Sequence, residues 1–233
     1  MHFLSFFPCV RIAHNARSGV SFSGVLYLLP CFGPFPTNHW AFTLDVPEWG
    51  RQDWGEPERA FARSDDGQPL ATLRQVSRLE ATLGSKQRSG GQLAIWDATF
   101  GPVGNDGYPQ PLFDESTGAI DHNVVLYMRN HGYDLRYYAQ THWAQIGREL
   151  AGKLHLACGD MDNFYLNLGV YLFAQFLEKV DSRDVEGSIK YGRPLKGHGW
   201  QPMTNAQLVR QMAERVAVKS PNGESTTWIG RGF

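Results

Sequence analysis

The sequence carries no excess charge of either sign and no long apolar run. Its 233 residues contain 22 Lys and Arg against 23 Asp and Glu, which gives a formal net charge of -1 at pH 7. A surface that binds nucleic acid or an anionic membrane usually has a basic excess, so neither partner is expected. No apolar run approaches the roughly 20 residues that a helix needs to cross a bilayer.

The sequence contains only three cysteines, and they are far apart. Cys9, Cys31 and Cys158 are widely separated and odd in number, a pattern that does not indicate a disulfide framework. Cys158 belongs to an apolar run, where a buried and inert thiol is the usual role. His155 lies three residues before it, so on a strand the two side chains point to opposite faces and cannot share a metal ion.

A calcium loop is also excluded. Residues 160–163 read Asp-Met-Asp-Asn and begin like such a loop. Phe164 and Tyr165, however, occupy the fifth and sixth positions, where a ligand and a glycine are required. No metal and no cofactor are therefore expected.

What the sequence does contain is a globular composition, with 42% hydrophobic and 13% aromatic residues, and a strand–helix–strand pattern. An apolar run at 153–158 ends in the polar turn 159–163, and a second run at 188–191 ends in Gly-Arg-Pro. Between them, residues 164–180 have apolar side chains at helical spacing. This pattern predicts two adjacent parallel strands joined by a right-handed crossover. The apolar run 25–29 predicts a third strand beside the first.

Further elements follow from caps and periodicity. We predict helices at 70–83, 121–129, 136–150 and from the capping box at 204–207 to about 216. In the first of these, apolar residues recur at helical spacing and Gly84 is positioned to cap the end: Leu70, Leu73, Val76, Leu79 and Leu83. Residues 92–96 predict a short strand, and 101–118, rich in Gly, Pro and Asp, a long loop. The fold class is thus α/β, with a small, mostly parallel sheet flanked by helices.

Candidate catalytic side chains follow the two predicted strands. Parallel strands present their functional residues on loops beyond their carboxyl ends. Asp160 and Asp162 follow the first strand, and His198 follows the second between two glycines. An acid after one strand and a histidine after the next is how α/β-hydrolases supply two members of a Ser-Asp-His triad. Either acid could serve, and one left over could cap the helix that follows.

Two longer motifs extend this likeness. The runs GDMDNFYLN at 159–167 and YGRPLKGHGWQPM at 191–203 resemble the putative-esterase branch of the α/β-hydrolase fold, relatives of feruloyl and enterochelin esterases. A weaker likeness extends upstream through GQPLAT at 67–72, RSGGQL at 88–93 and GYDLRYY at 132–138, so that it covers roughly residues 52–217.

The resemblance implies carboxylic-ester hydrolysis on a small-molecule ester. It also implies His198 as the general base and favours Asp162 over Asp160 as the acid that orients it. It divides the chain into an N-terminal segment at 1–50 without likeness to the family, a region at 51–218 like the C-terminal portion of an esterase domain, and a flexible tail at 219–233.

A nucleophile is missing from the pattern. Serine hydrolases of this fold place the serine on a strained G-x-S-x-G turn between a strand and a helix. Ser18, Ser21, Ser23 and Ser89 come nearest, and each has a larger residue or no strand at the required position. The sequence therefore predicts either an ester hydrolase that uses an unrecognised serine such as Ser89 or Ser18, or an inactive truncated remnant or interaction module. An incomplete sheet would leave an open edge, so pairing with a partner or a second copy is also expected.

Overall fold

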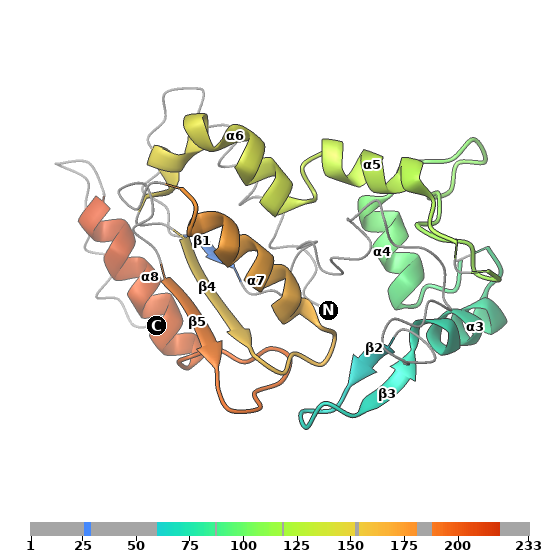
Figure 1. Cartoon of the computed structure of the whole chain (residues 1–233), viewed down its shortest axis with the longest axis horizontal. Helices are drawn as coiled ribbons and strands as arrows, with labels where there is room; N and C mark the ends of the chain where they lie inside the picture. The colour runs from blue at the N-terminus through green and yellow to red at the C-terminus, as the bar shows by residue number, and fades with distance from the viewer. Residues whose placement is uncertain are drawn as a thin grey trace.

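The computed structural model describes residues 26–28, 60–86, 88–117, 119–151, 154–180 and 188–219. Within these ranges the chain is a mixed α/β protein with one parallel sheet and one small antiparallel hairpin (Figure 1). The predictions for the tail beyond Lys219, for the N-terminal segment apart from 26–28 and for Ser18, Ser21 and Ser23 lie outside the described residues.

The parallel sheet has three strands in the order β1-β4-β5. Strand β4 (Leu154–Gly159) is buried along its whole length and pairs with β1 (Leu26–Leu28) on one side and β5 (Ser188–Gly192) on the other. The register aligns Gly159 with Gly192, so β4 and β5 end at the same edge. The three predicted strands and their parallel order are confirmed.

Helices α6 (Leu135–Leu150) and α7 (Leu166–Leu177) supply the core of the sheet region. Alternate residues of β4 pack against apolar side chains of both helices, as expected for one buried sheet face. The cluster consists of Ala139, Leu154, Leu156, Cys158, Val170, Phe173 and Phe176. Cys158 is buried, as predicted, and its thiol donates to the carbonyl of Gly159 at 3.2 Å.

A second core lies in the neighbouring region formed by α3 (Leu73–Leu83), α4 (Gln92–Phe100) and α5 (His122–Asn130). Its buried members are Leu73, Phe100, Leu112, Phe113, Val124, Val125 and Met128. The antiparallel pair β2 (Ala60–Arg63) and β3 (Pro69–Thr72) adjoins α3 (Figure 1). This hairpin carries no clear apolar alternation and was not predicted.

The predicted strand at 92–96 is wrong, because these residues form α4. The carboxylate of Glu80, on α3, accepts hydrogen bonds from the N–H groups of Leu93 and Ala94 at 2.9 and 3.2 Å. A carboxylate at the first turn satisfies free N–H groups and interacts favourably with the helix dipole. A contact with another helix therefore overrides the local preference for a strand.

The predicted helix at 70–83 is confirmed from Leu73 onward. Thr72 and Gln75 form a capping box, so the helix begins at Leu73, and Leu70 belongs to β3. The buried residues of α3 are Leu73, Ser77 and Glu80, whereas the side chains of Leu79 and Leu83 are exposed. The buried Glu80 faces the beginning of α4, to which its carboxylate is hydrogen-bonded.

The caps predicted at Asp121 and at 204–207 are confirmed, and a further cap at Asp134 was not predicted. Asp121 accepts from the N–H of Asn123 and opens α5, and Asp134 accepts from Tyr137 and opens α6. Helix α8 (Asn205–Lys219) follows the reciprocal hydrogen bonds of Thr204 and Gln207. Residues 101–117 are irregular apart from isolated bridges. None of the described helices combines the length and apolar character needed to cross a membrane.

Candidate functional site

The site forms where β4 and β5 end and their two loops meet. The N–H of Asp160 donates to the carbonyl of Gly192 at 3.1 Å, and the N–H of Met161 donates to the carbonyl of Lys196 at 3.0 Å. A Cβ on Gly159 would overlap the carbonyl oxygens of Lys196 and Gly197. The loop after β5 therefore lies directly against the end of β4, which brings His198 to the acid-bearing turn.

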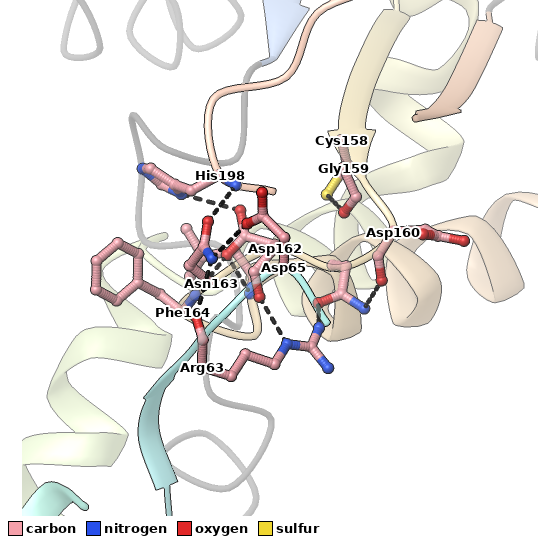
Figure 2. Close-up of polar contacts among 11 residues, drawn as sticks. Arg63, Asp65, Cys158, Gly159, Asp160, Asp162, Asn163, Phe164 and His198 are labelled. Carbon is pink, nitrogen blue, oxygen red and sulfur yellow. Dashed lines mark hydrogen bonds and ion pairs between the residues drawn. The ribbon is translucent and has the colours of Figure 1, made fainter. Parts of the chain in front are cut away.

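Asp162 and His198 form a hydrogen-bonded pair. Nδ1 of His198 lies 2.9 Å from Oδ2 of Asp162, and the two side chains point toward one another in Figure 2. The carboxylate is almost fully buried, with 3% of its side chain exposed, while the histidine side chain is 32% exposed. The loops after β4 and β5 therefore meet, as expected for adjacent parallel strands. The catalytic role of Asp162 and His198 stays a prediction.

The other oxygen of Asp162 holds the turn. Oδ1 accepts hydrogen bonds from the N–H groups of Phe164 at 2.9 Å and Leu166 at 3.2 Å. Leu166 is the first residue of α7, and Tyr165 before it has a left-handed backbone with φ of 62°. Asp162 thus satisfies N–H groups at the beginning of α7 with one oxygen and orients the imidazole with the other.

Asp160 does not cap the helix, contrary to the prediction. Its Oδ2 forms an ion pair with Nε of Arg193 at 3.1 Å, and its backbone carbonyl accepts from the side chain of Asn167 at 3.2 Å. Oδ1 is buried and no described residue hydrogen-bonds to it. The capping role falls to Asp162 because the turn places that carboxylate, and not Asp160, against the N–H groups of α7.

Two side chains that were not predicted complete the site. Asn163 accepts from the N–H of His198 at 2.7 Å. Arg63, at the end of β2, donates from Nε to the carbonyl of Asp162 at 2.9 Å and from Nη2 to Asn167 at 3.0 Å. Asn163 lies within the motif at 159–167, which could have drawn attention to it. Arg63 lies 99 residues before Asp162, and no local pattern marks it.

Phe164 borders the exposed side of the pair. Its ring meets the His198 imidazole edge-on, with centroids 5.0 Å apart and planes at 89°. It also contacts Phe61 of β2 edge-on at 5.8 Å. The Phe164 side chain is partly open to solvent. The Phe164 ring and the partly exposed imidazole therefore adjoin one another at the surface.

The tautomer of the neutral imidazole follows from its partner. A carboxylate accepts hydrogen bonds, so Nδ1 of His198 is the protonated nitrogen in the neutral ring. Nε2 then carries the lone pair, and among the described residues none hydrogen-bonds to it. A neutral imidazole with Nδ1–H held by a carboxylate can remove a proton from a hydroxyl or from water.

No described serine supplies a hydroxyl to this nitrogen. Ser89 donates to Glu80 at 2.7 Å and accepts from the N–H of Gly91 at 2.9 Å, so it helps to begin α4. Ser77 donates to the carbonyl of Glu115. Ser188 pairs with Nδ1 of His155 at 2.8 Å, at the opposite end of β4 and β5 from the candidate site.

The described residues contain no group of three or more His, Cys, Asp or Glu side chains that could hold a metal ion. Nδ1 of His131 bonds to the carbonyl of Tyr127, and Nδ1 of His142 bonds to the carbonyl of Tyr138, four residues earlier in each case. These are ordinary structural contacts of a histidine in or beside a helix. The candidate site as described consists of a carboxylate, an imidazole and the polar side chains that support them.

Comparison with models of protein families, with curated proteins and with solved structures finds no match to this chain.

Proposed function

We propose that this chain carries the base and the orienting acid of a carboxylic-ester hydrolase of the α/β-hydrolase type. The observation that carries the proposal is the 2.9 Å contact between Nδ1 of His198 and the buried carboxylate of Asp162. The pair lies at the carboxyl ends of adjacent parallel strands, where enzymes of open α/β folds place their reactive groups. The likeness of the flanking motifs to putative esterases indicates the reaction class.

The expected chemistry follows from the free nitrogen. Nε2 of His198 removes the proton of an attacking hydroxyl, whose oxygen forms a bond to the ester carbonyl carbon. The same nitrogen returns the proton to the departing alcohol oxygen as the carbon–oxygen bond breaks. Asp162 keeps the ring in the correct tautomer and stabilises the imidazolium that forms between these steps.

The test is turnover of p-nitrophenyl acetate by the purified full chain. We expect His198→Ala to abolish it and Asp162→Asn, which keeps the size of the side chain, to reduce it strongly because it disfavours the required tautomer. His131→Ala is the matched control, since His131 is exposed and its ring bonds only locally to the Tyr127 carbonyl. Equal turnover by the wild type and by His198→Ala would refute the proposal.

A second function is supported by the partners of the serines. Because the described serine hydroxyls bond elsewhere or have no contact with His198, we keep as an alternative a non-catalytic remnant or interaction module. A fluorophosphonate probe, which labels activated serines, separates the two. Labelling that is lost in His198→Ala supports the hydrolase, and absence of both labelling and turnover supports the alternative.

Ser89 can be examined directly with the same probe. Its hydroxyl donates to the buried Glu80 carboxylate, so we expect Ser89→Ala to leave labelling and turnover unchanged. Loss of a hydrogen bond to a charged group should lower the free energy of unfolding by about 1–3 kcal/mol. Loss of labelling in a folded Ser89→Ala variant would instead identify Ser89 as the nucleophile.

A further inference from the structure

Asn163 connects three separate segments at the candidate site. Its Oδ1 accepts from the backbone N–H of His198 at 2.7 Å. Its Nδ2 donates to the carbonyl of Arg63 at 2.9 Å and to Oδ1 of Asp65 at 2.8 Å (Figure 2). An N–H must face an oxygen, and a carbonyl and a carboxylate must face an NH2 group, so these partners fix the orientation of the amide.

The turn that bears Asn163 is fixed from the other side by Arg63. The backbone N–H of Arg63 donates to the carbonyl of Asn163 at 2.8 Å, and its Nε donates to the carbonyl of Asp162 at 2.9 Å. The guanidinium also lies over the ring of Tyr165, with 4.4 Å from Cζ to the ring centroid. The end of β2 therefore holds both the backbone and the side chain of the turn after β4.

Close packing makes this contact specific. A Cβ on Gly197 would lie 2.6 Å from Oδ1 of Asn163 and would overlap the carboxylate of Asp65. Only a residue without a side chain lets the β5 loop approach closely enough for the N–H of His198 to reach Asn163. The loop is thereby fixed at the residue whose ring must meet Asp162.

We propose that Asn163 is the positioning residue that holds His198 against Asp162. The imidazole has two anchors, its own Nδ1–H bond to Asp162 and the backbone bond to Asn163. Without the amide, the N–H of His198 and the carbonyl of Arg63 lose their partners, and the loop after β5 is free to shift. A displaced ring loses its bond to Asp162 and, with it, the preference for the Nδ1–H tautomer.

This preference can be measured without any catalysis. The nitrogen-15 shifts of the His198 ring, correlated with its carbon-bound protons, report which nitrogen carries the proton. They are recorded on the full chain at a pH where the ring is neutral and are assigned by their absence in His198→Ala. We expect mainly the Nδ1–H tautomer in the wild type. In Asn163→Ala we expect a shift toward Nε2–H, the tautomer that free histidine prefers.

Two further variants control for packing. Asn163→Asp keeps the size of the side chain but points an acceptor at the Arg63 carbonyl and at Asp65, so it should also weaken the Nδ1–H preference. Adding Asp65→Asn restores a donor between residues 163 and 65 and should recover part of it. Asn130→Ala, at an exposed asparagine of α5, should leave the His198 signals unchanged.

The effect on turnover rests on the proposed function and is read separately. If the chain hydrolyses esters, Asn163→Ala should lower kcat by roughly tenfold to a hundredfold with KM little changed, because the base is misplaced while the substrate still binds. A tautomer shift in a chain without turnover would refute the esterase and keep the positioning role. Folded Asn163→Ala and Asn163→Asp with wild-type ring signals would overturn the positioning role and leave the esterase proposal standing.

Discussion

Asp97 should make the stability of this protein depend on pH in the direction opposite to that of most carboxylates. The residue lies on α4 with 3% of its surface exposed, and its Oδ1 accepts from the N–H of Leu112 at 3.1 Å. Burial raises its pKa from 3.8 to about 7, and the nearby charge of Glu80 acts in the same direction. The single hydrogen bond to Leu112 lowers the pKa and offsets only part of this rise.

The sign follows from comparing the two states. The folded protein holds the Asp97 proton more tightly than the unfolded chain does, so folding is favoured at low pH and weakened as pH rises through the folded pKa of about 7. A shift of one unit corresponds to about 1.4 kcal/mol, and the part of the shift that falls between pH 5 and 8 amounts to about 3 kcal/mol. This is a large fraction of the stability of a typical domain.

Urea unfolding at a series of pH values measures the effect. The wild type should lose about 3 kcal/mol of unfolding free energy between pH 5 and 8. Asp97→Asn keeps an acceptor for Leu112 but cannot ionise, so its stability should vary much less over this range. Asp114→Asn is the control: Asp114 is exposed, and hydrogen bonds from Thr117 lower its pKa, away from this window. Identical pH profiles for wild type and Asp97→Asn would refute the reasoning.

Two further predictions concern packing. Gly159→Ala would make a methyl group overlap the carbonyl oxygens of Lys196 and Gly197, so it should separate His198 from Asp162. We expect the His198 ring to shift toward the Nε2–H tautomer and the free energy of unfolding to fall by about 1–3 kcal/mol. A wild-type tautomer in the variant would contradict this. Leu73→Ala should lower the unfolding free energy in urea by about 3 kcal/mol because Leu73 is buried, whereas Leu79→Ala, at a residue 64% exposed, should change it by less than about 0.5 kcal/mol. Equal losses of unfolding free energy would mean that Leu79 is buried as fully as Leu73.

The parts of the fold that could be predicted are those that local sequence determines. The apolar runs and polar turns around β4 and β5 predicted two parallel strands, and this topology predicted that their two loops would meet. Asp121 marked the beginning of α5, and the capping box at 204–207 that of α8, in the same local way. Each of these signals lies within a few residues of the feature that it specifies, so a pattern in the sequence was sufficient.

The features that the sequence did not predict depend on contacts between residues far apart in the chain. Residues 92–96 form a helix whose first N–H groups are satisfied by the carboxylate of Glu80 on α3. Arg63 reaches the acid turn from 99 residues away. Neither contact leaves a periodic trace in the sequence, because each depends on one polar side chain whose partners are backbone groups of another segment.

Asp162 shows why loss of function alone would not identify its role. Oδ2 meets the imidazole, while Oδ1 accepts the N–H groups of Phe164 and Leu166 at the beginning of α7. Asp162→Ala removes both contacts, so a loss of activity could result from a disordered turn. Asp162→Asn can retain an acceptor at Oδ1 and present an NH2 group to the histidine, which changes the tautomer and leaves the turn in place. A folded Asp162→Asn variant with an altered tautomer would therefore assign the orienting role to Oδ2 itself, separately from the structural role of the same side chain.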